Sequence, residues 1–501
     1  MSLHESILEP AVPVTPAEAS SRDGLVGRIR ALETAAAALD PGEVERRRIH
    51  VAIDAVVEGF LSGLDTLPAF RRDDRGGLPD AITEGGIAVE SAAEMLEREV
   101  LRPGGNPASP RHLAYITGGG LYHAALADYF AAASNKFAGL AATGPGPVRM
   151  ENAVVRWAAD VVGYPPSAGG HIASGGSLAT LSAITAARDA HRLRATDFDS
   201  AVVYTTEQAH HCIEKALRIA GMAGAPVRRV PMDERYRMRP DALADTIAAD
   251  RGCGLRPWLV VATAGTTDTG AVDPLEALSD VAERERCWFH VDAAYGGFFV
   301  LADHGRRVLA GIERSDSVVL DPHKSLFLPW GAGMVLVRDI RSLLVTHGAT
   351  GSYLQDAMEM VSDPSPADVS PELTKPFRAL KVWLPLVVIG TSAFRAALEE
   401  KLLLARYFHR EIAAAGFEVG PAPDLSIVPF RWAPPGATPE ETDRMNQRII
   451  ARLRDDGELF LSSTTIDGRF MLRSCFLSFR THLAVVDLAV RLLKEQVVLF
   501  E

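Results

Sequence analysis

Cysteine is scarce in this sequence of 501 residues, and its scarcity excludes two common ways of stabilising a fold. The only cysteines are Cys212, Cys253, Cys287 and Cys475. No two of them form a CxxC pair, so neither a disulfide framework nor a structural zinc site is expected. This cysteine usage predicts a protein of the reducing cytoplasm.

The chain also lacks the segments that would direct it to a nucleic acid or a membrane. No block rich in lysine or arginine stands out and the net charge is −12, so a nucleic-acid partner is not expected. No run of roughly 18 or more apolar residues is present, so no transmembrane helix is expected. Residues 1–22 contain Pro10, Pro13 and Pro16 but no apolar core after a basic start, which predicts a flexible tail and no signal peptide.

The chain is too long for one compact core, so two or three domains are expected. Apolar residues at three- and four-residue steps predict an N-terminal helical segment over residues 23–110. Between about 170 and 337, short apolar runs alternate with amphipathic helices, which predicts an α/β fold with a mostly parallel sheet in a large domain of residues 111–385. Residues 386–501 predict a smaller α/β domain.

Two predicted strands end in residues that a cofactor enzyme can use. FHVDAAYGG (289–297) ends its strand at Asp292, and SVVLDPHKSL (317–326) runs into Lys324. A carboxylate can keep a pyridine nitrogen protonated, and a lysine in a dry site can lose its proton and attack an aldehyde. Alone, each also fits an ordinary capping or surface role. Because ligands bind beyond the carboxyl ends of parallel strands, we expect both residues to reach one ring.

A third segment, HIASGGSLATL (171–181), predicts a strand, a tight turn and the start of a helix. Gly176 and Ser177 would lie at the helix N-terminus, where backbone N–H groups and the helix dipole favour a phosphate. The same turn often caps a helix without any ligand.

A fourth segment, TEQAHHCIEKA (206–216), places His210 between a strand and a helix. A flat imidazole there could stack on a cofactor ring. A metal site made by His210, His211 and Cys212 is not expected, because neighbouring residues point to different faces of an element.

A fifth segment, VATAGTTDTGAVDPL (261–275), places Thr266 after a strand, either as a cofactor or substrate contact or as part of an ordinary turn. The five segments follow successive strands and supply a phosphate cradle, a stacking histidine, a threonine, a carboxylate and a lysine. Together they indicate pyridoxal 5′-phosphate (PLP) as the cofactor.

On these motifs the chain resembles the group II PLP-dependent amino-acid decarboxylases, which include the aromatic-L-amino-acid, histidine and glutamate decarboxylases. The resemblance extends from about residue 50 to the C-terminus, and HVDAAYGG and DPHKSL are its most specific parts. It implies PLP-dependent fold type I, as in aspartate aminotransferase. It also implies a homodimer with active sites at the subunit interface.

The resemblance implies a role for each site residue. Lys324 would hold PLP as a Schiff base, and Asp292 would pair with the pyridine nitrogen. Ala294 and His210 would lie against opposite faces of the ring, and His323 would add a phosphate or active-site contact. Asp321 stands where relatives have asparagine or aspartate. The other implied cofactor contacts are Gly176, Ser177 and Thr266.

Two departures from the family pattern bear on the reaction. Decarboxylases of the family carry a tyrosine in a mobile loop, whereas residues 355–383 contain none, and Tyr353 matches a different family position. In relatives, loss of that tyrosine accompanies reaction with oxygen. The second departure lies in residues 134–151, where small residues predict a pocket for a larger or more polar amino acid. These small residues are Gly139, Ala141, Ala142 and Gly144.

The main prediction is therefore a decarboxylase of specialised metabolism that acts at Cα of a bulky or polar amino acid. Two other outcomes stay open, namely decarboxylation with oxidative deamination to an aldehyde and elimination of a β-substituent. A non-catalytic PLP-binding protein is the alternative of another class, and the intact set Lys324, Asp292 and His210 argues against it.

Overall fold

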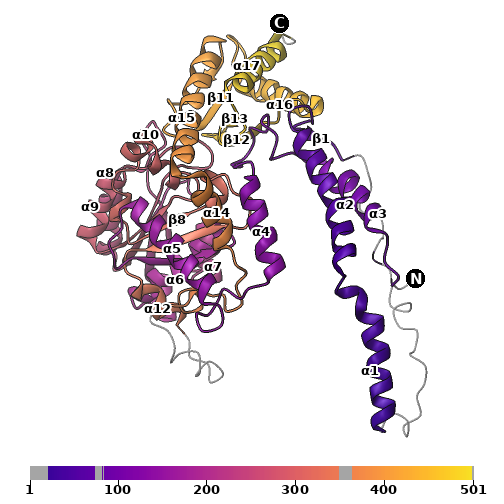
Figure 1. The fold of residues 1–501 in the computed structure, drawn as a ribbon. Coiled ribbons are helices and arrows are strands. Elements are labelled where there is room, and N and C mark those ends of the chain that lie inside the picture. The colour runs from indigo at the N-terminus through magenta and orange to yellow at the C-terminus, as the bar shows by residue number, and fades with distance from the viewer. Residues whose placement is uncertain (1–20, 74–81, 83, 349–363, 499–501) are drawn as a thin grey trace, which may run out of the picture. The chain divides into compact units, whose positions relative to one another are not determined.

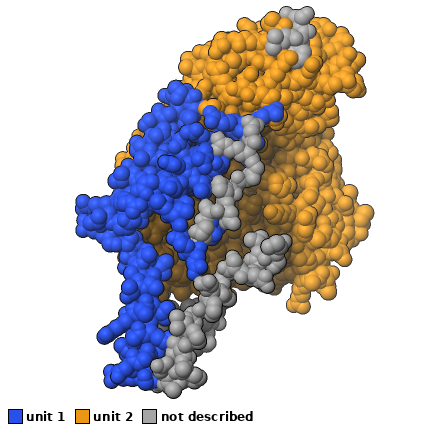
Figure 2. Space-filling view, turned by 90° about the vertical axis from the view of Figure 1, so that its right-hand side faces the viewer, with its two compact units in different colours: residues 1–67, 71–104 blue, residues 68–70, 105–501 orange. Residues whose placement is uncertain are grey.

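The computed structural model describes residues 21–73, 82, 84–348 and 364–498. The chain divides into two compact units, drawn in blue and orange in Figure 2. The first comprises residues 1–67 and 71–104, and the second comprises residues 68–70 and 105–501. Most of the predicted tail, residues 1–22, lies outside the described residues.

The first unit is helical. Its helices are α1 (Arg22–Ala36), α2 (Glu43–Ser62) and α3 (Val89–Met95), with the short turns η1 (Ala37–Leu39) and η2 (Leu96–Leu101). Ser21 caps α1 by accepting a hydrogen bond from Gly24 N at 3.1 Å. Arg48 of α2 pairs with Glu90 of α3 at 2.8 Å. Neither α1 nor α2 fully buries a residue in the described chain, and several of their apolar side chains are exposed, including Leu32 at 65% and Val51 at 66%. The short strands β1 (Phe70–Arg71) and β2 (Gly104–Gly105) lie where the chain passes between the units.

A seven-stranded sheet forms the centre of the second unit (Figure 1). Its strand order is β3-β9-β8-β7-β6-β4-β5, and only β9 runs antiparallel to its neighbours. This mostly parallel sheet confirms the predicted α/β fold. Its strands are β3 (Gly169–Ala173), β4 (Ala201–Thr205), β5 (Val227–Arg229), β6 (Arg256–Thr263), β7 (Trp288–Asp292), β8 (Ser317–Leu320) and β9 (Gly333–Val337).

Helices cover both faces of this sheet, because alternate side chains of a strand point in opposite directions. In β6, Val260 and Ala262 belong to the apolar core under α5, α8 and α9, whereas Leu259 and Val261 pack with α6 and α7. The helices of this part are α4 (Tyr122–Ser134), α5 (Pro145–Val162), α6 (Gly176–Ala190), α7 (Cys212–Ile219), α8 (Pro240–Gly252), α9 (Leu275–Glu285), α10 (Asp303–Val308), α11 (Pro322–Ser325), α12 (Arg341–His347) and α14 (Ala379–Ile389). The 3-10 turns are η3 (Ala195–Ser200), η4 (Gly297–Leu301), η5 (Ile312–Arg314) and η7 (Pro366–Asp368).

The C-terminal part has its own antiparallel sheet, in the order β10-β11-β13-β12. A separate core holds it to its helices, with the Phe408 ring centroid 5.2 Å from that of Phe430 and 5.0 Å from that of Phe476. This part belongs to the second compact unit, so the division into domains 111–385 and 386–501 stays a prediction. Its elements are α15 (Thr391–Ala414), β10 (Glu418–Val419), β11 (Ile427–Arg431), α16 (Pro439–Asp456), β12 (Ser462–Ile466), β13 (Arg469–Cys475) and α17 (Leu483–Val498).

Across the part of the chain that the structure describes, no single helix has the length and apolar character of a membrane span. The adjoining helices α14 and α15 meet that test only as a pair, and they are bent by 94° at their junction. All four cysteines are free thiols.

Candidate active site

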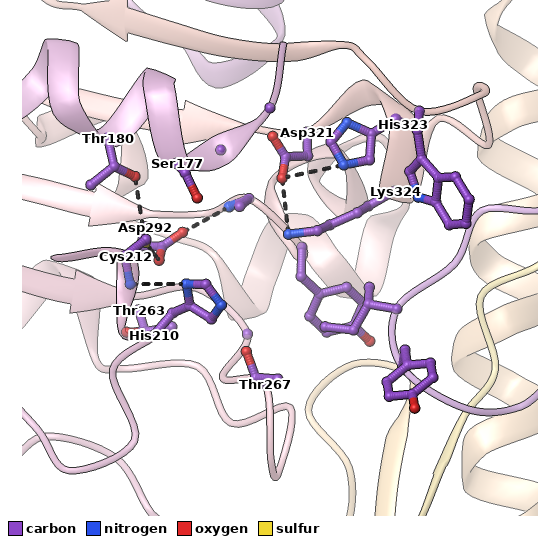
Figure 3. A pocket seen from close by; sticks show the side chains of 18 of the residues that line it. Ser177, Thr180, His210, Cys212, Thr263, Thr267, Asp292, Asp321, His323 and Lys324 are labelled. Carbon is purple, nitrogen blue, oxygen red and sulfur yellow. Dashed lines mark hydrogen bonds and ion pairs between the residues drawn. The ribbon is translucent and has the colours of Figure 1, made fainter. Parts of the chain in front are cut away.

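A cavity of about 610 Å³ lies in the second unit, where the carboxyl ends of β6, β7 and β8 meet the N-terminus of α6 (Figure 3). Its volume falls in the range of small-molecule sites, about 300–1,000 Å³. The structure thus brings seven of the eight predicted cofactor contacts into one cavity, and their individual roles stay predictions. These seven are Gly176, Ser177, His210, Asp292, Ala294, His323 and Lys324.

Asp292 is a buried carboxylate with few partners. It ends β7 in register with Thr263 of β6, and the residue is only 6% exposed. Its Oδ1 accepts a hydrogen bond from Ala294 N at 3.2 Å, and the Cys212 thiol lies 4.0 Å from Oδ2. Within the described ranges, no lysine or arginine forms an ion pair with it. A buried carboxylate needs a positive partner, and a protonated pyridine nitrogen fits that need.

Lys324 lies on the one-turn helix α11, which directly follows β8. Its Nζ is 2.9 Å from Oδ2 of Asp321. Burial alone would lower the pKa of this lysine. The negative charges of Asp321 and, to a smaller extent, Asp292 raise it, and the net result is a pKa above the ordinary value. The ammonium form of Lys324 is therefore favoured in the protein without cofactor, because the Asp321 carboxylate pairs with it.

The N-terminus of α6 forms an anion cradle. Gly175 precedes the helix, and no side chain of the described residues caps it. Leu178 N and Ala179 N donate to the carbonyl oxygen of Gly175, which leaves the N–H groups of Gly176 and Ser177 for a ligand. A Cβ atom on Gly176 would lie 2.9 Å from Oδ2 of Asp321, which shows why a glycine stands at this place. The helix has 15 residues, long enough for a dipole that favours a phosphate. The cavity thus offers a group for each end of PLP.

His210 lines the cavity from the loop between β4 and α7. Its Nδ1 accepts a hydrogen bond from Cys212 N at 3.2 Å, and its ring centroid is 4.0 Å from that of His211. Burial lowers the pKa of His210, so the imidazole is neutral near pH 7. The acceptor role of Nδ1 then assigns the ring hydrogen to Nε2.

His323 and Ala294 complete the predicted set on the side of Asp321. His323 Nδ1 donates to the carbonyl oxygen of Ala332 at 2.6 Å, and its Nε2 lies 3.7 Å from Oδ2 of Asp321. Burial lowers the pKa of His323, so this ring is also neutral near pH 7. Ala294 follows Asp292 by two residues and lines the cavity.

The structure does not bring Thr266 to the cavity. Its hydroxyl lies 2.7 Å from that of Thr269 and accepts a hydrogen bond from Ala271 N at 3.2 Å, inside the buried turn. Thr263 and Thr267 line the cavity instead. Adjacent residues point in different directions, and the role of Thr266 as a cofactor contact stays a prediction.

Sequence analysis did not indicate another part of the cavity lining, which includes Arg473 of β13. Its Nε donates to the carbonyl oxygen of Thr267 at 2.7 Å, and its Nη1 donates to that of Tyr115 at 3.0 Å and to Ser462 Oγ at 3.0 Å. Its Nη2 is buried and has no partner in the described chain. Tyr115 and Trp330 are also part of the lining. No motif marks these residues, which lie far apart in the sequence.

The small residues of segment 134–151 do not line the cavity of the described chain. A Cβ atom on Gly139 would strike the carbonyl oxygen of Leu373, and one on Gly144 would strike that of Phe137. Close backbone packing therefore accounts for these two glycines, and the predicted small-walled pocket has no support from them. Tyr353 and part of the tyrosine-free segment, residues 355–363, lie outside the described residues.

Metal binding has no candidate in the described residues, where no group of three or more histidine, cysteine, aspartate or glutamate side chains could hold an ion. The cavity is therefore best described by its lysine, its carboxylates and its anion cradle.

Comparison with known proteins agrees with this geometry. Residues 90–433 match the family model of the pyridoxal-dependent decarboxylase conserved domain. The chain is 33% identical over 446 residues to an aromatic-L-amino-acid decarboxylase of Bacillus atrophaeus, covering 88% of this chain and 92% of that protein. It is 26% identical over 442 residues to a phenylacetaldehyde synthase of Arabidopsis thaliana, covering 85% and 90%. The crystal structure of Oryza sativa TDC with PLP and tryptamine superposes with a TM-score of 0.87 at 27% identity, covering 92% and 99%.

Proposed function

The chain belongs to the pyridoxal-dependent decarboxylase family, and from that premise we propose that it removes the α-carboxylate of an amino acid in the cavity around Lys324 and Asp292. The observation that carries this proposal is the presence of both residues and the uncapped N-terminus of α6 in one cavity. An amine, a buried carboxylate and an anion cradle suit the aldehyde, the pyridine nitrogen and the phosphate of PLP, respectively. The enzyme is a carboxy-lyase that depends on PLP.

PLP, when bound, supplies a sink for the electron pair that stays on Cα after the carboxylate leaves. Asp292 would favour a proton on the pyridine nitrogen, which makes the ring a stronger acceptor of that electron pair. Gly176 and Ser177 hold the phosphate through backbone N–H groups at the start of α6. Lys324 would provide the amine that anchors the cofactor through its aldehyde.

His210 is the proposed proton donor. Its neutral ring carries a hydrogen on Nε2, because Nδ1 accepts the N–H group of Cys212. Loss of that hydrogen would turn the neutral ring into an imidazolate, so His210 would give a proton to Cα from its imidazolium form, which it reaches by taking one proton from solvent. Burial lowers the pKa of His210, so the neutral ring predominates near pH 7 and the imidazolium form is a stronger acid than an ordinary one.

An aromatic L-amino acid is the proposed substrate. Tyr115 and Trp330 offer flat side chains at the wall of the cavity, and aromatic groups favour stacked or edge-to-face contacts with one another. The Nη2 group of Arg473 offers a hydrogen-bond donor to a carboxylate or polar substituent. The similarity to a protein named for aromatic-L-amino-acid decarboxylation supports the same choice.

Oxygen-dependent formation of an aldehyde is the second candidate outcome. The absence of tyrosine from residues 355–383 favours it, and one relative is named phenylacetaldehyde synthase. No observation in the described residues favours elimination of a β-substituent.

Product analysis with and without oxygen tests both outcomes. The purified protein is incubated with PLP and L-tyrosine, L-tryptophan or L-phenylalanine, and carbon dioxide, amine, aldehyde and peroxide are measured. We expect carbon dioxide with the matching amine in both atmospheres. Aldehyde and peroxide in air, with their loss under nitrogen, would instead identify the second outcome. Absence of carbon dioxide from a panel of all protein amino acids would refute decarboxylation.

A homodimer is the proposed assembly. Helices α4 and α14 pack together, and both leave large apolar side chains exposed, including Tyr129 at 62% and Phe130 at 60%. A second copy that covers this surface would remove them from water. Sedimentation analysis should give twice the chain mass for the native protein and a monomer for Phe130→Glu. A native monomer would contradict the proposal.

The reducing cytoplasm is the proposed compartment, and the four free cysteines support it. The proposed partner is a small amino acid. The net charge of −12 supports the absence of a nucleic-acid partner. Fractionation of cells that express a tagged chain would test the location, and recovery in a membrane or secreted fraction would contradict it.

A further inference from the structure

Asp321 is an acidic residue placed between the reactive lysine and the phosphate cradle. It follows β8, and its Oδ2 is 2.9 Å from Lys324 Nζ and 3.7 Å from His323 Nε2. Its Oδ1 is buried and has no hydrogen-bond partner in the described chain. Figure 3 shows the carboxylate with dashed lines to both neighbours. The family assignment gives no role to this arrangement.

Two glycines make room for this carboxylate. A Cβ atom on Gly176 would lie 2.9 Å from Oδ2, and one on Gly333 would lie 2.7 Å from Oδ1. The carboxylate therefore fits a niche beside the first residue of α6, where the helix dipole favours a negative charge. The site thus has two anion-stabilising features near Asp321, namely the dipole and the lysine.

The other groups that face Lys324 are Asp292 at the end of β7, Cys212 at the start of α7, His210 in the preceding loop and His323 on α11. Burial raises the pKa of Cys212 to about 12, so its thiol is neutral near pH 7. Burial also lowers the pKa of both histidines, so they add no positive charge there. Asp321 and Asp292 are then the two charged groups that decide the form of the lysine, and only Asp321 is paired with it.

We propose that Asp321 is a positioning residue that keeps Lys324 in the ammonium form and directs it along the phosphate cradle in the protein without cofactor. Before this lysine reacts with an aldehyde, the ammonium must give one proton to solvent. The free amine then attacks the aldehyde carbon, and one water molecule leaves. Asp321 thereby sets the pH above which the cofactor can attach. Because this role concerns the protein without cofactor, it does not depend on which product the enzyme forms.

The test is competitive acetylation of the cofactor-free protein with a trace of acetic anhydride between pH 7 and pH 11. Mass spectrometry of the Lys324 peptide reports the fraction of neutral amine, and the side chain is 25% exposed, so the reagent can reach it. We expect the midpoint of the Asp321→Asn profile to lie at least about one pH unit below that of the wild type. Acetylation at pH 8 would then be about tenfold faster in the variant.

Asp128→Asn is the matched control. Asp128 pairs with a buried lysine, Lys381, at 2.7 Å, and neither residue is part of the cavity lining, although Lys381 Nζ also donates to the carbonyl oxygen of Trp330 at 3.1 Å. This variant should shift the profile of Lys381 and leave that of Lys324 unchanged. Equal midpoints for Lys324 in the wild type and in Asp321→Asn would overturn the proposal. A change in plateau without a change in midpoint would also overturn it, since that result indicates altered access alone.

The wild type provides a test if Asp321→Asn does not fold. A buried lysine without a partner has a pKa below its ordinary value, whereas a paired one can exceed it. The NMR resonance of Nζ in the cofactor-free wild type, followed against pH, should titrate above 10.5. Titration below that value would overturn the proposal.

Discussion

Lys375 and Lys324 each pair with a carboxylate, yet the two pairs lie in different settings. Lys375 is 2.6 Å from Glu151, and the two side chains are 0% and 2% exposed. Lys324 is 2.9 Å from Asp321, but its side chain is 25% exposed because it borders the cavity. A lysine–carboxylate pair that solvent cannot reach therefore stabilises the fold, whereas a pair that borders a cavity can take part in chemistry.

The Glu151–Lys375 pair shows what the sealed setting requires. Glu151 on α5 also accepts a hydrogen bond from Ile172 N at 3.0 Å, so one carboxylate joins α5, β3 and the segment before α14. No ligand can reach such a pair. We therefore expect that loss of the Glu151–Lys375 pair lowers the stability of the fold, whereas loss of Lys324 lowers turnover.

Lys324→Ala should have the largest effect of all. Turnover should fall by about 10³-fold or more, because no other lysine of the described ranges lines the cavity to anchor the cofactor. The visible absorbance that PLP gives to the wild type should be lost, while the thermal midpoint of the cofactor-free protein should change little. Both are measured on purified protein with added PLP. Retained turnover would show that the reactive lysine has been wrongly assigned.

Lys375→Met should have the opposite effects, with a large loss of stability and little change in turnover. Glu151 would stay buried without its cation, which costs about 3–5 kcal/mol of the free energy of unfolding. Urea unfolding measures the loss, and turnover per folded molecule should match the wild type. Replacing Glu151 by Gln in the same chain should recover part of the stability. A stable Lys375→Met variant with impaired turnover would break the distinction between the two pairs.

The histidines of this chain show a similar contrast between a buried position and one that borders the cavity, with smaller expected effects. His290 of β7 is buried with its Nδ1 2.8 Å from Ser317 Oγ, and burial lowers its pKa to about 4. The unfolded chain therefore binds a proton below about pH 6.5 that the folded chain does not, so stability is lost as the pH falls from 6.5 towards 4.

Between pH 7 and pH 5, the free energy of unfolding of His290→Gln should therefore fall by about 2 kcal/mol less than that of the wild type. Urea unfolding at the two pH values measures this difference. The difference for His210→Gln should be smaller, because the His210 ring borders the cavity and is only partly buried. Equal pH dependence in the wild type and His290→Gln would show that His290 does not resist protonation.

The sequence predicts one half of the site well and the other half poorly, for a physical reason. Asp292 and Lys324 follow buried strands directly, and parallel strands bring their carboxyl ends to one edge, so a local pattern suffices. Tyr115 and Arg473 reach the cavity from segments distant in sequence, through the packing of β13 against the loop at Thr267. Such contacts leave no local pattern. Thr266 lies beside Thr267 of the lining but points elsewhere, because adjacent residues of a chain point in different directions, and a local pattern does not decide between the two.

Arg473 offers the sharpest test of that second half and the smallest expected effect. Arg228 is its matched counterpart, because Nε and Nη2 of Arg228 both donate to Asp250, Nη2 at 2.6 Å, whereas Arg473 keeps a buried Nη2 without a partner in the described chain. Lys cannot reproduce the fork of donors that holds Thr267 and Tyr115 and also faces the cavity. Arg473→Lys should therefore raise KM for an aromatic amino acid about tenfold, the equivalent of about 1.4 kcal/mol, with a smaller change in kcat. Arg228→Lys should leave KM unchanged, and an equal KM in all three proteins would remove Arg473 from the substrate side of the cavity.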